Sequence, residues 1–106
     1  MRVVVTGGAG FIGANLVRRL LAEDHAVVVV DDLSTGSRAN LAGLVGPLTI
    51  HEATVLDAAV LDEAMAGSAA VVHLAARPSV PRSIDDPLAT HVANVDGTLA
   101  VLEAAR

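Results

Sequence analysis

The stretch Thr6-Gly7-Gly8-Ala9-Gly10-Phe11-Ile12-Gly13 decides the fold, because it joins a strand pattern to a helix pattern. Before it, residues 2–6 form a short β-branched run, which is typical of a strand buried on both faces. After it, apolar residues recur at helical spacing over residues 11–23. The apolar positions of this predicted helix are Ile12, Leu16, Val17, Leu20 and Leu21.

Strand and helix patterns alternate along the rest of the chain. Further strands are predicted at residues 26–30, 48–51 and 69–74, and helices at 37–44, 57–66 and from 86 onward. The loop after the fourth strand would contain Pro78 and Pro81. The last helix would carry an apolar stripe made of Leu88, Val92, Val95, Leu99 and Leu102. This alternation favours an α/β fold with a parallel sheet and right-handed crossovers.

Length and composition exclude several classes of protein. A chain of 106 residues has room for one domain, and 53% hydrophobic residues exclude disorder. Without cysteine, and with its four histidines far apart, the chain has no predicted disulfide or metal site. A net charge of −5 and a single aromatic residue argue against nucleic acid as a partner. Short apolar runs argue against a membrane span, and the early glycines against a secretory signal, so we expect a cytoplasmic protein.

The glycine-rich turn is a candidate phosphate site because of where it stands. Residues 7–13 satisfy both Gly-x-x-Gly-x-x-Gly and Gly-x-Gly-x-x-Gly. Glycines let a pyrophosphate approach the backbone N–H groups of a helix N-terminus, whose dipole favours an anion. Asp31 ends the second predicted strand, where its carboxylate can accept hydrogen bonds from an adenosine ribose. The alternative is that the glycines only pack a tight turn and that Asp31 is a solvated loop acid.

Asp31 also predicts which dinucleotide is preferred. The 2′-phosphate of NADP at 4 Å from this carboxylate would cost about 4 kcal/mol per charge pair at an effective dielectric of 20. We therefore expect NAD rather than NADP. Arg38 is the nearby cation that would weaken this preference, and Asp32 would strengthen it.

Three further motifs accompany residues 6–13, and they are Asp31-Asp32-Leu33-Ser34-Thr35-Gly36, Val72-His73-Leu74-Ala75-Ala76 and Asn94-Val95-Asp96-Gly97-Thr98. Together the four motifs resemble those of the extended short-chain dehydrogenase/reductases, particularly NAD-dependent nucleotide-sugar epimerases and dehydratases of the UDP-glucose 4-epimerase type. The resemblance implies a Rossmann-type fold with helices on both faces of a partial parallel sheet, in the strand order 3-2-1-4. Residues 1–106 would then be the N-terminal, NAD-binding portion of such an enzyme.

The resemblance also implies cofactor contacts, residue by residue. Gly7, Gly10, Phe11 and Ile12 would surround the pyrophosphate, with Gly13 closing the motif, and Asp31, Asp32, Thr35 and Gly36 would surround the adenosine ribose. Leu74, Ala75, Ala76 and Arg77 would line the path to the nicotinamide half, and Asn94 would stand near the cofactor and support the fourth strand. His73 is interpreted as a packed or hydrogen-bonded residue, and His51 and His91 as residues without a role at the site.

The chain departs from the family pattern after the third strand. The family usually shows Gly-Asp-x-x-Asp there, and its first aspartate meets the adenine amino group. This chain reads Ala53-Thr54-Val55-Leu56-Asp57, so Thr54 and Val55 become the residues expected at the adenine. The Thr54 hydroxyl is a neutral acceptor, and losing the carboxylate would cost about 1 kcal/mol of binding.

The second departure concerns catalysis. Members of the family use a Tyr-x-x-x-Lys pair, in which the tyrosine exchanges a proton with a sugar hydroxyl. This chain has neither tyrosine nor lysine, so no catalytic residue is assigned and turnover by the chain alone is not expected. A nucleotide-sugar substrate would require the missing C-terminal part, and epimerase, dehydratase and decarboxylase all stay open.

The alternative function is a non-catalytic dinucleotide-binding or sensor module that pairs with a partner chain. In either case the fourth strand would be an open sheet edge, because in the family a fifth strand covers it. We therefore expect self-association through this edge or through the last helix.

Overall fold

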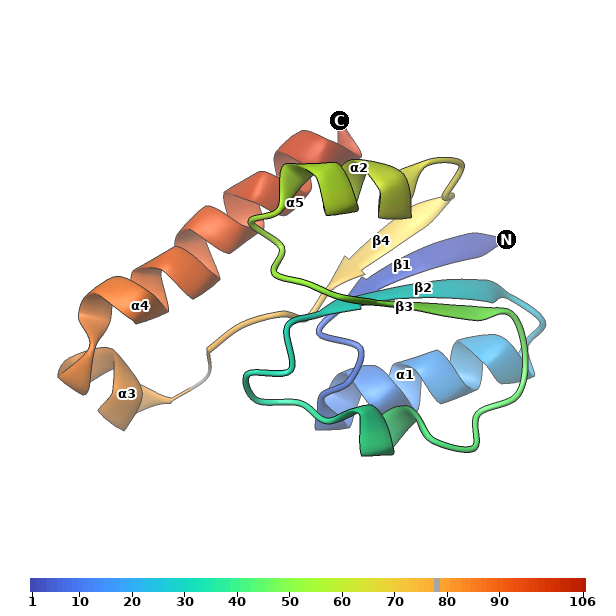
Figure 1. Cartoon of the computed structure of the whole chain (residues 1–106), viewed down its shortest axis with the longest axis horizontal. Coiled ribbons are helices and arrows are strands. Elements are labelled where there is room, and N and C mark those ends of the chain that lie inside the picture. The colour runs from blue at the N-terminus through green and yellow to red at the C-terminus, as the bar shows by residue number, and fades with distance from the viewer. Residues whose placement is uncertain (78) are drawn as a thin grey trace.

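The computed structural model of the chain describes residues 1–77 and 79–106. Four parallel strands form a single sheet in the order β3-β2-β1-β4 (Figure 1). They are β1 (Arg2–Thr6), β2 (Ala26–Asp31), β3 (Leu48–Glu52) and β4 (Ala70–His73). The predicted parallel sheet and its strand order are confirmed.

Helices cover both faces of this sheet, as the resemblance implies. They are α1 (Phe11–Ala22), a 3₁₀ turn η1 (Arg38–Leu41), α2 (Ala58–Met65), α3 (Val80–Asp85), α4 (Pro87–His91), a π turn η2 (Val92–Asp96) and α5 (Gly97–Ala105). Figure 1 shows α1 on one face of the sheet and α2 and α5 on the other. We refer to α4, η2 and α5 together as the helical arm.

Alternating valines in β1 and β2 build two apolar clusters. Val5 and Val29 pack toward α1 together with Val17, whereas Val4 and Val28 pack with residues of α2 and α5 on the opposite face. A parallel strand with helices on both sides is buried on both faces, which explains the unbroken valine runs of the sequence. These two central strands fix the position of the turns that follow them.

The buried stripe of α1 agrees with the prediction except at its first residue. Residues Gly13, Ala14, Val17 and Leu21 are buried, whereas Ile12 is 70% exposed and Leu16 and Leu20 are only partly buried. Small residues at 13 and 14 let the first turn approach the sheet closely, so the helix turns this side toward the core. The predicted positions Leu16, Val17, Leu20 and Leu21 do pack against the core, so the spacing located the buried face and was wrong only at Ile12.

Two further predictions needed correction. The short helix after Ser37 ends at Leu41 rather than at residue 44, because only a single 3₁₀ turn forms. Pro81 lies in the first turn of α3 rather than in a loop, since a fixed φ and a missing N–H suit that position, and Ser79 caps this helix through the amide of Arg82. Pro78 lies outside the described residues.

The last helix begins as predicted, with the Asp86 carboxylate accepting from the amide of Ala89 at 3.1 Å. Its apolar stripe is mostly exposed: Leu88, Val95, Leu99 and Leu102 are at least half exposed and Val92 is intermediate. Gly97 and Val101 are the buried residues of α5. Across residues 1–77 and 79–106, none of the helices is long and apolar enough to cross a membrane.

Candidate functional site

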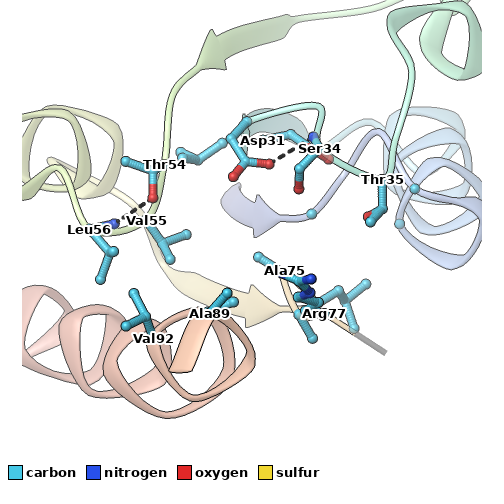
Figure 2. Close-up of a pocket in the computed structure, with 18 of the residues that line it drawn as sticks. Asp31, Ser34, Thr35, Thr54, Val55, Leu56, Ala75, Arg77, Ala89 and Val92 are labelled. Atoms are coloured by element: carbon cyan, nitrogen blue, oxygen red, sulfur yellow. Dashed lines mark hydrogen bonds between the residues drawn. The ribbon is translucent and has the colours of Figure 1, made fainter. Parts of the chain in front are cut away.

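A cleft of about 1040 Å³ opens where the four strands end (Figure 2). Its walls are formed by the turns that follow each strand, by the first turn of α1 and by one side of the helical arm. Figure 2 shows Asp31 and Ala75 on opposite sides of the cleft, with Ala89 and Val92 of the helical arm opposite Val55. Open parallel sheets bind ligands at the carboxyl ends of their strands, where the strand order reverses, and β1 stands at that reversal here.

The structure brings most of the predicted site residues to this one cleft. All of them except Gly36 and Asn94 line it. Gly36 instead packs under the glycine-rich turn, where an added Cβ would lie 2.8 Å from the carbonyl carbon of Ala9. Asn94 stands behind the wall: its Oδ1 accepts from the amide of Arg77 at 2.6 Å and its Nδ2 donates to the Arg77 carbonyl at 3.2 Å. Both residues therefore support the cleft rather than line it.

The glycines of the turn between β1 and α1 are required for different reasons. Gly7 has φ +70°, and a Cβ there would lie 2.7 Å from the amide nitrogen of Ala75, so the turn after β1 touches the turn after β4. A Cβ on Gly13 would lie 2.2 Å from the Gly7 carbonyl oxygen. Packing thus demands glycine at both positions.

Gly10 is different, because packing does not demand it. A Cβ on Gly10 would meet the Gly7 carbonyl oxygen at 3.4 Å, an ordinary contact. Gly10 also lines the cleft and precedes the first residue of α1. The missing side chain keeps the space in front of this helix open to a ligand.

The N-terminus of α1 offers hydrogen-bond donors to that space. Within the described part of the chain, no side chain caps α1, and no carbonyl accepts from the amides of Phe11, Ile12 or Gly13. These residues line the cleft. A helix of 12 residues adds the positive end of its dipole, so the cleft has the chemistry of an anion site at this point.

Asp31 is an inward-facing acid rather than a solvated one. Its side chain belongs to a residue only 7% exposed, and it lines the cleft at the end of β2. Oδ2 accepts from the amide of Ala9 at 2.9 Å, and Oδ1 accepts from the amide of Leu33 at 2.8 Å. A carboxylate has about four acceptor positions, so two remain for ligand hydroxyls. Asp31 therefore ties the glycine-rich turn to β2 and still presents acceptors to the cleft.

The arginines that line the cleft do not include Arg38, the cation that the sequence placed near Asp31. Arg38 is exposed in η1 and is not among the residues that line the cleft, so its effect on the cofactor preference stays a prediction. The lining arginines are Arg77, which was predicted, and Arg82 of α3, which was not.

Residues near the expected adenine position form another part of the wall. The Thr54 hydroxyl accepts from the amide of Leu56 at 3.2 Å, and its own proton stays available to donate. Val55 is buried and packs with the cluster beneath α2 and α5. Thr54 thus supplies a neutral polar group in place of a carboxylate.

Several lining residues were missed by sequence reasoning. They are Val30, Ser34, Ala53, Leu56, Arg82, Asp86, Leu88, Ala89, Val92 and Ala93. Four of them adjoin predicted residues at strand ends. Ala89, Val92 and Ala93 share one side of the helical arm, and the i, i+3, i+4 spacing was the available signal. Asp86 was recognised only as a helix cap.

The cleft lies at the carboxyl ends of the parallel strands, where the strand order reverses, and it holds both the anion site and Asp31. This arrangement is that of a Rossmann-type α/β protein. The model of one family, described as the NAD dependent epimerase/dehydratase family, matches residues 3–106. The chain therefore belongs to the NAD dependent epimerase/dehydratase family.

Individual relatives agree with this assignment. UDP-glucose 4-epimerase of Mycolicibacterium smegmatis is 44% identical over all of this chain, which covers 35% of that protein. Among solved structures, UDP-glucose 4-epimerase of Thermus thermophilus in complex with NAD has a TM-score of 0.87 at 39% identity, over 98% of this chain and 33% of the other. A dTDP-glucose 4,6-dehydratase of Streptomyces venezuelae, with NAD bound, has a TM-score of 0.92 at 39% identity, over 99% and 35%. The chain spans about a third of the length of the relatives it matches.

Proposed function

We propose that this chain binds NAD in the cleft, as the dinucleotide-binding portion of an NAD-dependent nucleotide-sugar epimerase or dehydratase. One observation carries the proposal: three amides at the start of α1, which have no acceptor among the described residues, and the inward-facing Asp31 carboxylate line the same cleft. A dinucleotide needs both an anion site for its diphosphate and an acceptor for its ribose hydroxyls. The family assignment supports the same cofactor.

The residues present fit such a ligand. The amides of Phe11, Ile12 and Gly13 would hold the diphosphate, and the bare Cα of Gly10 leaves room for it. Asp31 would accept from the ribose hydroxyls, with Asp32 and Thr35 around it and with Thr54 and Val55 toward the adenine, while Gly36 would support this region from beneath the glycine-rich turn. The turn at residues 74–77 would line the nicotinamide half. When bound, NAD supplies a hydride acceptor for a substrate alcohol.

Asp31 also supports a preference for NAD over NADP. Its carboxylate accepts two backbone amides and lies at the end of β2, so it is held in place and cannot turn away from a 2′-phosphate. Repulsion between the two groups is about 4 kcal/mol per charge pair at 4 Å and a dielectric of 20. Arg38 does not line the cleft, so the cation that could offset this repulsion is not part of its wall.

Turnover would require groups beyond the 106 residues of this chain. The sequence has no tyrosine and no lysine, and the cleft's acids and arginines do not replace a phenol that exchanges a proton with a sugar hydroxyl. We therefore propose that residues 1–106 form the cofactor-binding portion, and that a nucleotide sugar binds only when a substrate-binding part is supplied. Cytoplasmic location remains a prediction of the sequence.

A second candidate is a non-catalytic NAD-binding module that receives its missing strands from a partner chain. It is favoured by β4, which is an edge strand of the sheet, and by the exposed Leu99 and Leu102 of the helical arm. Either surface would support self-association or a partner. A reading frame that continues into Tyr-x-x-x-Lys favours the enzyme, and a stop codon directly after Arg106 favours the module.

Isothermal titration of the chain with NAD and with NADP tests the proposal. We expect saturable heat with NAD and binding at least roughly tenfold weaker with NADP, since 1.4 kcal/mol of repulsion already gives that ratio. An absence of saturable NAD binding would overturn both candidates. Equal affinity for the two dinucleotides would overturn the role of Asp31 alone.

A further inference from the structure

A chain of side-chain hydrogen bonds runs behind the cleft and connects β1, β4 and α5. The Thr6 hydroxyl contacts Nδ1 of His73, and Nε2 of His73 lies 3.2 Å from Oγ1 of Thr98. The Thr98 hydroxyl donates to the Asn94 carbonyl at 2.6 Å. None of Thr6, His73 and Thr98 is among the lining residues of the described chain, and the cofactor contacts proposed above do not include them.

The Thr6 end of this chain determines the role of one ring nitrogen. The amides of Leu74 and Ala75 donate to Thr6 Oγ1 at 3.1 and 3.2 Å, so both lone pairs of the hydroxyl are occupied. A hydroxyl has a single proton, and here the remaining partner is His73. Thr6 therefore donates, and Nδ1 of His73 accepts.

The Thr98 end gives an independent answer for the other nitrogen. The Thr98 proton is directed to the Asn94 carbonyl, so toward His73 this hydroxyl can only accept. Nε2 of His73 must then carry a proton. Both ends therefore require the same species, a neutral imidazole protonated on Nε2.

We propose that Thr6, His73 and Thr98 are positioning residues for the dinucleotide cleft, with neutral His73 holding the turn after β4 in place. This inference rests on the proposed function. The turn, residues 74–77, forms one wall of the cleft and is fixed at two points. The Thr6 hydroxyl holds the amide of Ala75, and Asn94 holds both backbone groups of Arg77. His73 is the link that joins these two points.

The charge of His73 decides whether the hydrogen bonds from Thr6 through His73 to Thr98 can all form. A protonated imidazole donates from both nitrogens, so its Nδ1–H would face a hydroxyl that already accepts two amides. Burial holds the pKa of His73 below its usual value of 6.5, which keeps the ring neutral near pH 7. The groups that face the ring from β1 and α5 are the uncharged hydroxyls of Thr6 and Thr98, and within the described residues no charged side chain hydrogen-bonds to it.

The ring nitrogens of His73 give the first test, by ¹⁵N NMR of the labelled chain at about pH 7.5. We expect the pattern of a neutral ring with Nε2 protonated and Nδ1 bare. The opposite tautomer, a ring that exchanges between tautomers, or a protonated ring would each overturn the proposal. This readout does not depend on NAD.

Substitutions at Thr98 give the second test, read as the Kd for NAD. Thr98→Val removes the hydroxyl and should weaken NAD binding by roughly two- to tenfold, the range that one neutral hydrogen bond supports. Thr98→Ser keeps the hydroxyl and should restore both the affinity and the Nε2–H signal. Thr90→Val is the matched control, because the buried Thr90 hydroxyl has no hydrogen-bond partner in the described structure, and it should change neither. Equal effects of Thr98→Val and Thr90→Val, or no rescue by serine, would overturn the proposal.

The pH profile of NAD affinity gives a third test that holds even if Thr98→Val does not fold. Affinity should stay level near and above pH 7 and fall only when the pH drops through the pKa of His73, which burial holds below the usual value of 6.5. His73→Asn should remove this fall, whereas replacing His25, His51 and His91 together by glutamine should leave it. The reverse pattern would contradict the proposal. If the wild-type chain binds no NAD at any pH, the proposed function fails, and the tautomer alone decides the role of His73.

Discussion

Helix α1 and the helical arm both carry an apolar stripe in the sequence, yet only α1 buries one. In α1, Val17 is fully buried and Leu21 is 7% exposed, whereas in the arm Leu99 is 59% and Leu102 63% exposed. The difference comes from what lies beneath each helix. The large residues of α1 pack against the central strands β1 and β2, but the arm turns small residues and Val101 toward the sheet and α2. An apolar pattern thus locates a face of a helix without telling what covers it.

Replacing one glycine in each helix by alanine should give the largest difference in the free energy of unfolding. Gly13→Ala in α1 would place a Cβ 2.2 Å from a backbone oxygen, which cannot shift freely, so we expect loss of folding or a cost above about 3 kcal/mol. Gly97→Ala in α5 would meet a Val55 methyl at 3.1 Å, and the gain in helix propensity of about 1 kcal/mol would offset that contact. Urea denaturation followed by circular dichroism measures both. Equal losses would show that α1 is not held more tightly than the arm.

Replacing one leucine on each helix by alanine should give the second largest difference in the free energy of unfolding. Leu21→Ala removes a buried side chain and should lower the free energy of unfolding by about 2–4 kcal/mol. Leu99→Ala on the exposed stripe should change it by less than about 0.5 kcal/mol in the monomer at low protein concentration. The same denaturation experiment compares them. A loss at Leu99 as large as that at Leu21 would mean that the stripe is covered in solution.

The ligand-binding side of the cleft, next to α1, is tested by Asp31→Asn at the end of β2, which keeps an acceptor but removes the charge. NAD affinity should fall by roughly tenfold, because hydrogen bonds to charged groups contribute about 1.5–3 kcal/mol. NADP affinity should fall less, so the preference for NAD narrows. Titration calorimetry measures both dinucleotides, and Asp62→Asn on exposed α2 is the control that should change neither. An unchanged NAD to NADP ratio would contradict the role of Asp31.

The exposed stripe of the arm should show its effect in association rather than in folding. Replacing Leu99 and Leu102 together by serine should shift the chain toward monomer in sedimentation velocity, by a factor of a few in the association constant. As a control, replacing the exposed Val45, which lies outside the helical arm, by serine should leave the association constant unchanged. If the wild-type chain is monomeric at all accessible concentrations, the expected self-association is wrong.

The sequence predicted those parts of the fold and of the site whose geometry depends on residues close together in the chain. The strand, the glycine-rich turn and the helix of residues 2–22 are contiguous, so the pattern of residues alone places Gly10 and Asp31 at the carboxyl edge of the sheet. Arg38 and Arg82 show the limit. Their distance from Asp31 depends on how the intervening loops turn, and these paths follow from long-range packing such as Gly36 against Ala9. The hydrogen-bond chain through His73 depends on such contacts as well.

The most direct test of the account is an NMR titration of the ¹⁵N-labelled chain with NAD, followed at the amides of Phe11, Ile12 and Gly13. These amides have no acceptor in the described structure, so a bound diphosphate should shift them strongly and saturably. The amide of Leu33, already bonded to Asp31, should report the ribose, and the amide of Leu102 in the arm should stay unchanged. Shifts confined to other parts of the chain, with the first turn of α1 unaffected, would contradict the account.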